Sequence, residues 1–297
     1  MDPVPIIDIG PLIGSPMGVA TPDATGAAIH EACLDTGFFV AVGHGCAEHI
    51  AATFDAAHRF FDLPQATKET LAMVDRRGYV PLERDRLDPG LHASPMEYYD
   101  LALDGENPWP PIEGFAAVLQ AHQDAALGVA AAVLRSLAVS LELDPAFFAD
   151  RMRTPQCFLR LMHYVPEPDG RTPVLTHPHT DYGAITLLAT DGVGGLEVEH
   201  PRLGWLPVEA PAGSFIVNLG DMLARWTNLR YASTPHRVLA PTHTDRYSIP
   251  FFVNPDPATV VECLPSCVSV DRPPRFEPVT AGEFLAKRIA DGGYMRG

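Results

Sequence analysis

The segment His177-Pro178-His179-Thr180-Asp181-Tyr182-Gly183 places an imidazole and a carboxylate two residues apart. In an extended backbone successive side chains alternate between two faces, so His179 and Asp181 point the same way and can hold one metal ion between them. A third ligand is then needed, and His236 supplies it if the 54 residues after Asp181 fold back as antiparallel strands. The sequence therefore predicts that two distant segments meet at one cation.

The predicted ligand set suggests the kind of metal site. Two imidazoles and one carboxylate on one side of a metal leave the opposite positions free, an arrangement associated with non-haem Fe(II) oxygenases. A His-x-Asp pair alone is weak support, because a chain with 12 His and 37 acidic residues contains such pairs by chance. His177 would share the face of His179 in a straight strand, so a His177/His179 pair stays open as the rival ligand set.

A second motif, Arg246-Tyr247-Ser248, begins ten residues after His236. Arg and Ser at positions i and i+2 of a strand share a face, and a guanidinium with a hydroxyl offers donors suited to a carboxylate. Residues 241–245 are predicted to form the turn between the His236 strand and the Arg246 strand. That turn would put the metal ligand and the carboxylate clamp on neighbouring strands.

At these residues the chain resembles the isopenicillin-N-synthase-like family of Fe(II)/2-oxoglutarate-dependent dioxygenases, whose motif is His-x-Asp, a distant His and Arg-x-Ser. Further segments are similar to the family and follow in the family's order. They include residues 4–8, 37–40, 44–45 and 60–64 in the N-terminal half, and residues 185–188, 195–198, 217–221 and 246–252 in the C-terminal half. The resemblance covers most of the chain and tells little about the substrate.

The resemblance implies a role for each residue of the two motifs. The implied Fe(II) ligands are His179, Asp181 and His236. The implied contacts of the co-substrate 2-oxoglutarate are Arg246 and Ser248 at its distal carboxylate, with Tyr164 as a nearby hydrogen-bond donor. With O2, such an enzyme oxidises a C–H bond of a small molecule by hydroxylation, desaturation, cyclisation or epoxidation, and releases succinate and CO2. Two alternatives stay open: a same-fold iron oxidase or ethylene-forming-type enzyme that does not couple 2-oxoglutarate in the usual way, and a non-catalytic small-molecule-binding module.

The apolar pattern changes after Pro155, where short segments with a period of two are separated by Gly, Pro and Asn or Asp turns. These predicted strands are residues 157–165, 184–190, 196–199, 205–208, 214–218, 236–239, 247–253 and 259–262. Many short strands without intervening helices predict a jelly roll, which is the double-stranded β-helix of the resembled family. Residues 113–143 instead show three- and four-residue apolar spacing, which predicts a long helix against the outside of the sheet.

We therefore expect a mainly β protein with flanking helices, organised as two regions. An N-terminal α/β region, including the long helix, is predicted for residues 1–150. A jelly-roll domain that carries the Fe(II)/2-oxoglutarate site and ends in a C-terminal helix is predicted for residues 151–297. Shorter elements complete the prediction: strands at residues 4–9 and 38–42, and helices at residues 21–35, 48–61, 65–73 and 280–290.

Residues 74–111 are predicted to be irregular, because they are rich in Arg, Asp, Pro and Gly. In the resembled family this region lies over the mouth of the active site. The candidate substrate contacts in it are therefore Arg84, Arg86, Tyr98 and Tyr99. A second set of polar residues is predicted to form a turn outside the site: Asn218, Gly220 and Asp221.

The composition of the 297-residue chain, with 46% hydrophobic and 20% charged residues, is that of an ordinary globular protein. A formal net charge of −16 without a run of Lys or Arg argues against nucleic-acid and anionic-membrane partners. The five Cys complete no zinc motif, so free thiols in a reducing compartment are expected. The N-terminus lacks a basic signal-peptide region, and the longest apolar helical stretch, residues 125–134, is shorter than a membrane span. We expect a cytoplasmic enzyme with a small-molecule substrate; its oligomeric state is not predicted.

Overall fold

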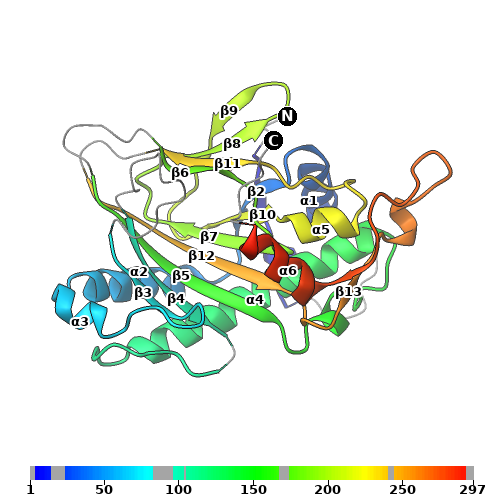
Figure 1. Cartoon of the computed structure of the whole chain (residues 1–297). Helices are drawn as coiled ribbons and strands as arrows, with labels where there is room; N and C mark the ends of the chain where they lie inside the picture. The colour runs from blue at the N-terminus through cyan, green and yellow to red at the C-terminus, as the bar shows by residue number, and fades with distance from the viewer. Residues whose placement is uncertain are drawn as a thin grey trace.

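Two β-sheets face each other, and α2 (Ala47–Phe61) and α4 (Phe115–Ser140) lie on the outer side of the larger one (Figure 1). The computed structural model describes residues 4–14, 24–82, 96–103, 105–166, 174–239 and 244–291. The larger sheet runs in the order β1 (Ile6–Asp8), β2 (Phe38–Val42), β10 (Phe215–Leu219), β7 (Ile185–Thr190), β12 (Arg246–Asn254), β5 (Gln156–Tyr164), β4 (Met96–Ala102) and β3 (Gly78–Val80). The smaller sheet runs in the order β6 (Val174–His179), β11 (His236–Leu239), β8 (Leu196–His200) and β9 (Gly204–Pro207).

The central strands of the larger sheet are buried on both faces. In β2, Phe39 and Ala41 belong to the large apolar cluster on the helix side, whereas Phe38 and Val40 belong to a second cluster between the sheets. This division follows from the two-residue period of an extended backbone, which gives each layer one set of side chains. The side chains on the face of the larger sheet that points toward the smaller sheet line the cavity of the candidate site.

The predicted fold class, a jelly-roll core with flanking helices and an N-terminal α/β region, is confirmed. Strands β1 to β4 come from the first 150 residues and join the same sheet as β5, β7, β10 and β12. They extend the double-stranded β-helix rather than forming a sheet of their own. One apolar cluster on the helix side takes residues from both halves of the chain.

The helix α4 is the predicted long helix. It packs against α2 and against α1 (Ala24–Asp35), and it also touches β7 and β12. By length and composition alone it is apolar enough to cross a membrane, and half of its most apolar 18-residue window is buried inside the protein. Its apolar part is therefore longer than the stretch at residues 125–134, and packing against the core accounts for it.

The remaining elements are short. They are α3 (Gln65–Glu69), α5 (Asp221–Trp226), α6 (Ala281–Ala290), the paired strands β13 (Val260–Val261) and β14 (Val279–Thr280), and the 3-10 turns Gly10–Leu12, Ala149–Arg151 and Pro265–Cys267. A capping box starts α6, because the Thr280 hydroxyl accepts a hydrogen bond from the Glu283 amide and the Glu283 carboxylate accepts one from the Thr280 amide. Two residues of this helix, Leu285 and Ile289, line the cavity.

The expectation that residues 74–111 are irregular is wrong in part. Strands β3 and β4 lie in this region, and β4 pairs with β5 along its whole length. All seven residues of β4 are buried, so the strand lacks the alternation that marks a half-exposed strand. Its acidic residues are not typical of a buried strand, but Glu97 and Asp100 form ion pairs there with Lys68 and Arg160.

Glu97 is the centre of a buried polar cluster on the helix side of β4. Its carboxylate accepts hydrogen bonds from Lys68 Nζ at 2.7 Å, from His163 Nδ1 at 2.8 Å and from the Tyr79 hydroxyl. Burial alone would raise the pKa of Glu97, but these three donors outweigh it and hold the pKa below its ordinary value. The folded state therefore favours the ionised carboxylate.

We expect Glu97→Gln to lower the free energy of unfolding by about 3 to 5 kcal/mol at pH 7, because it leaves the buried Lys68 ammonium without its counter-charge. In the wild type the ionised Glu97 stabilises the fold above its unfolded-state pKa, 4.5, and this contribution is lost as the pH falls through the lower folded-state pKa. The difference between the two proteins should thus shrink below about pH 4.5. Urea unfolding from pH 3 to pH 7 measures it, with exposed Glu113→Gln as the control; a constant difference would contradict the prediction.

Candidate functional site

His179 and His236 are direct partners across two antiparallel strands, β6 and β11 of the smaller sheet. Asp181 lies two residues beyond the end of β6. The ligand atoms of these three residues lie within 4.8 Å of one another, and Asp181 Oδ1 is 3.8 Å from His236 Nε2. The fold-back that the spacing predicts is therefore confirmed, although Asp181 itself lies in the loop after the strand.

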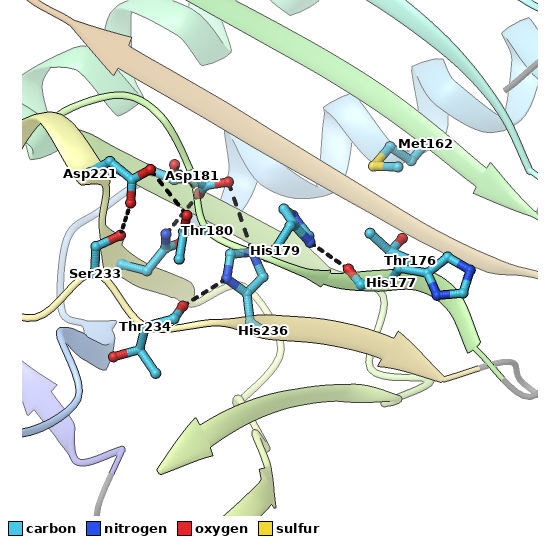
Figure 2. A network of polar contacts seen from close by, with 12 residues as sticks. Met162, Thr176, His177, His179, Thr180, Asp181, Asp221, Ser233, Thr234 and His236 are labelled. Atoms are coloured by element: carbon cyan, nitrogen blue, oxygen red, sulfur yellow. Dashed lines mark hydrogen bonds and ion pairs between the residues drawn. The ribbon is translucent and has the colours of Figure 1, made fainter. Parts of the chain in front are cut away.

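Both imidazoles are oriented by the backbone. His179 Nδ1 lies 2.9 Å from the carbonyl oxygen of His177, and His236 Nδ1 lies 3.3 Å from that of Thr234, as Figure 2 shows. Each Nδ1 therefore carries the proton and donates it, so that the unprotonated Nε2 is the atom suited to bind a metal. Burial, followed by the neighbouring His236, lowers the pKa of His179 to about 4, so this ring is neutral at pH 7.

The Asp181 carboxylate is held in place through one oxygen. Its Oδ2 accepts hydrogen bonds from Thr186 Oγ1 at 2.6 Å and from Asn218 Nδ2 at 2.7 Å. Its Oδ1 is turned toward His236 and stays available as a ligand. Burial opposes ionisation, but the two imidazoles and these hydrogen bonds outweigh it, and the pKa of Asp181 lies below its ordinary value.

The loop that carries Asp181 is fixed by a close approach between two chain segments. The amide of Asp221 donates to the carbonyl of Asp181 at 2.8 Å, and a Cβ on Gly220 would lie 2.3 Å from the Gly183 carbonyl oxygen. The Asp221 carboxylate accepts hydrogen bonds from Thr180 and Ser233 (Figure 2). It also accepts one from Arg288. Only glycine at position 220 allows this contact.

This arrangement corrects one prediction. Asn218, Gly220 and Asp221 are predicted to form a turn outside the site, but Asn218 lies in β10 and contacts the Asp181 carboxylate, while Asp221 opens α5. Their polarity resembles that of turn residues, so the local pattern contains no sign of the contact. Only the alternation of side chains along β10 could have indicated the contact, because it places Asn218 on the same face as Ile216, between the two sheets.

We expect Thr186→Val to weaken Fe(II) binding by about 10- to 100-fold, because a lost partner of a metal-ligating carboxylate typically costs this much. Valine keeps the shape of threonine but cannot donate to Asp181 Oδ2. Thr186→Ser keeps the hydroxyl and is the matched control, expected to bind Fe(II) like the wild type. Anaerobic Fe(II) titration measures the affinity, and equal affinity in the valine and serine variants would refute the role of Thr186.

Arg246 and Ser248 lie on the larger sheet and face the same cavity as the three ligands. Arg246 is 1% exposed; its Nε donates to the Gly194 carbonyl at 2.7 Å, whereas no residue in the described part of the chain accepts a hydrogen bond from its buried Nη1. The Tyr164 ring lies 5.0 Å from the Arg246 guanidinium carbon, and its hydroxyl contacts Met162 Sδ and Thr176 Oγ1. A buried guanidinium with an unpaired donor is costly unless an anion pairs with it.

The expected route between the metal ligand and the clamp is wrong. β11 lies in the smaller sheet and β12 in the larger, so His236 and Arg246 are not on neighbouring strands. They meet because the two sheets face each other across the cavity (Figure 1). The predicted turn falls at residues 241–245, of which residues 241–243 lie outside the described part of the chain.

The remaining candidate ligands and substrate contacts differ in where they lie. His177 does not join the ligand cluster; its carbonyl orients His179 and its ring points away from the cluster (Figure 2). Tyr98 lines the cavity, whereas Tyr99 is on the opposite face of β4 and packs against Phe60. The candidates Arg84 and Arg86 lie outside the described residues.

The cavity between the sheets has a volume of about 480 Å³. It holds the three-ligand cluster, the Arg246 clamp and a further region lined mainly by aromatic and apolar side chains. The donor set fits a divalent iron: two neutral imidazole nitrogens and one carboxylate oxygen, with Oδ1 and Nε2 separated by a distance that one ion with bonds of about 2.1 Å can bridge. The unpaired Arg246 Nη1 likewise fits an organic carboxylate.

Comparison with known proteins agrees with this geometry. Residues 155–255 match the 2OG-Fe(II) oxygenase superfamily, and residues 4–115 match the family described as non-haem dioxygenase in morphine synthesis N-terminal. A 2-oxoglutarate-Fe(II) type oxidoreductase of Aspergillus fumigatus is 35% identical over 88% of this chain and 85% of its own length. The 2-oxoglutarate-dependent dioxygenase citB of Monascus ruber is 35% identical over 84% of each chain.

The solved structures that resemble this chain agree as well. A full-length Neurospora crassa protein in complex with alpha-KG and thymine superimposes with a TM-score of 0.87 at 27% sequence identity, covering 97% of this chain and 96% of that chain. The likeness therefore extends over both sheets and the flanking helices. It includes the region between the sheets in which the ligand cluster lies.

Proposed function

Because this chain belongs to the isopenicillin-N-synthase-like family within the 2OG-Fe(II) oxygenase superfamily, and is therefore a 2-oxoglutarate-dependent dioxygenase, we propose that it oxidises a C–H bond of a small molecule in the cavity between its sheets. His179, Asp181 and His236 would hold Fe(II). Arg246, Ser248 and Tyr164 would bind 2-oxoglutarate. Succinate and CO2 are the expected co-products, and the substrate is expected to undergo hydroxylation, desaturation, cyclisation or epoxidation.

One observation carries the assignment of the co-substrate site. Arg246 is almost completely buried, and its Nη1 has no hydrogen-bond partner among the described residues, although Arg246 lines the cavity that also contains the ligand cluster. An anion at this position would supply the missing acceptor, and the Ser248 hydroxyl on the same face of β12 would add a second donor. A dicarboxylate held there would lie in the same cavity as the metal ligands.

The chain's own residues prepare the site. Fe(II) bound there would supply the activation of O2 and the oxidising power for the C–H bond. The backbone carbonyls of residues 177 and 234 keep both imidazoles turned with Nε2 toward one point. Thr186 and Asn218 hold the Asp181 carboxylate so that one oxygen faces that point. The apolar walls exclude water from the reacting centre.

Binding of the co-substrate can be tested without knowing the substrate. Fe(II) and 2-oxoglutarate are added to the metal-free protein in the absence of O2, and a visible charge-transfer band is expected. On admission of air, 2-oxoglutarate should be converted to succinate, and faster once a substrate is present. A non-catalytic binding module would give neither signal. An iron oxidase of the same fold would turn over without stoichiometric succinate.

A further inference from the structure

The cavity continues past the ligand cluster, away from Arg246, to a second arginine, Arg76. Alternate residues of β5 line this path: Tyr164, Met162, Arg160 and Phe158. In the pairing of β5 with β12, Tyr164 stands opposite Arg246, and Phe158 stands opposite Phe252. The six residue steps from Tyr164 to Phe158 span about 20 Å of strand. Phe158 therefore lies toward the end of the cavity that is far from the co-substrate clamp.

Arg76 lies over the face of Phe158, with its guanidinium carbon 4.2 Å from the ring centre. The neighbouring Arg160 is paired differently: it binds both oxygens of Asp100, at 2.6 and 2.7 Å, and its guanidinium lies over Tyr98. Within the residues that the structure describes, Arg76 forms no ion pair. Both oxygens of Asp100 are bound by Arg160, so Asp100 acts on Arg76 only through its charge at longer range, and Arg76 is a cation at the cavity without a direct acidic partner among the described residues.

The backbone that carries Arg76 is a strained turn. Asp75 and Arg76 have φ values of 48° and 65°, and the turn is closed by mutual hydrogen bonds between Val74 and Arg77. Such a turn, with two consecutive left-handed residues, normally takes Asn or Gly, and a longer side chain such as arginine is strained there. Gly78 anchors the turn, because a Cβ on it would lie 2.4 Å from the Leu71 carbonyl. Strain at a cavity mouth is typical of a functional position.

We propose that Arg76 binds a carboxylate of the substrate, with the apolar body of that substrate lying between Phe158 and the metal centre. The walls of this region suit such a body, because Tyr98, Phe252, Leu285 and Ile289 line it. A guanidinium over an aromatic ring keeps its in-plane N–H groups free for a carboxylate. The substrate class is therefore a small organic acid with an aromatic or aliphatic body. That the enzyme oxidises this acid rests on the proposed function, whereas the binding of the acid at Arg76 does not.

The co-substrate itself does not explain Arg76. A five-carbon dicarboxylate is at most about 6 Å long, because each carbon–carbon bond is about 1.5 Å. It cannot extend from Arg246 to the far end of the cavity, about 20 Å away along β5. An anion at Arg76 must therefore belong to a second molecule.

The probe for this subsite is 4-phenylbutyrate, with the neutral 4-phenylbutanamide as its uncharged counterpart. Calorimetric titrations are made without O2 on the full chain loaded with Fe(II) and saturated with 2-oxoglutarate, so that the Arg246 end is filled. We expect the carboxylate to bind about tenfold more tightly than the amide. Arg76→Gln should abolish this preference, and Arg76→Lys should retain part of it. Arg153→Gln, which removes an exposed arginine outside the cavity, is the matched control and should keep the full preference.

The proposal is overturned if the acid and the amide bind equally to the wild type, or if Arg76→Gln keeps the preference for the acid. A parallel titration of the metal-free Arg246→Gln variant separates the two proposals. One outcome is that 2-oxoglutarate neither binds to nor is converted by the iron-loaded protein, while the metal-free Arg246→Gln variant still prefers the acid and loses this preference when Arg76 is also replaced. In that case the proposed co-substrate site is wrong and the subsite at Arg76 stands. If the preference in the metal-free protein depends on Arg246 instead, the probe occupies the co-substrate end and the subsite is refuted.

Discussion

Asp181→Ala should abolish the iron-dependent conversion of 2-oxoglutarate to succinate and should prevent tight Fe(II) binding. The variant removes the only carboxylate of the ligand cluster within the described residues, and with it the charge that offsets the cation. Metal ions contribute several kcal/mol to the reactions they catalyse, so the loss of activity should reach about 1,000-fold or more. His236→Ala should act similarly, because it removes the cross-strand ligand. Succinate release and anaerobic Fe(II) titration are the measurements.

The control must separate loss of the ligand from loss of the fold. Asp150→Asn changes an exposed carboxylate far from the cavity and should leave both iron binding and succinate formation unchanged. Circular dichroism of Asp181→Ala should match the wild type, because the surrounding strands remain packed. Iron-dependent turnover at the wild-type level in Asp181→Ala would refute the assignment of the ligand cluster.

Arg246→Ala should raise the KM for 2-oxoglutarate by about 30-fold to several thousandfold. Truncating one partner of a buried, hydrogen-bonded charge pair costs about 2 to 5 kcal/mol, and each 1.4 kcal/mol is a factor of ten. Because Arg246 is proposed to bind the co-substrate and is not part of the ligand cluster, Fe(II) affinity should change little. Arg246→Lys should recover part of the loss, since an ammonium keeps the charge but not the two-pronged geometry.

Arg237→Ala is a stringent control for this prediction. Arg237 follows His236 on β11, but its side chain is paired with Glu197 and lies over Trp205 rather than in the cavity. Its removal changes the net charge by the same amount next to a metal ligand. The KM for 2-oxoglutarate should stay within about twofold of the wild type, because solvent-accessible pairs contribute little. An equal rise in both variants would mean that overall charge, not the clamp, governs co-substrate binding.

The sequence alone identified the side chains that we propose to carry the chemistry. Residue type and spacing suggested His179, Asp181 and His236 but left a His177/His179 pair open, and the family resemblance favoured the first set. The two-residue period of a strand placed Arg246 and Ser248 on one face, and the resemblance implied their role. Most of the strands after Pro155 and the long helix α4 were also predictable, because their apolar periods are local properties, but β6, which carries His179, and β14 are absent from the predicted strands. Strand β4 was not, since its acids are balanced by partners that are 29 and 60 residues away along the chain.

Only the tertiary structure decided how these residues meet. His236 and Arg246 face each other from two sheets, because sheet membership depends on long-range strand pairing that no local pattern encodes. Thr186 and Asn218 became partners of Asp181 because β7 and β10 pass beneath its loop, although each reads as an ordinary polar residue in sequence. Arg76 reaches the cavity through a turn whose left-handed backbone the sequence Asp-Arg does not favour. Local patterns fixed the identity of the groups, and packing between distant segments fixed their positions.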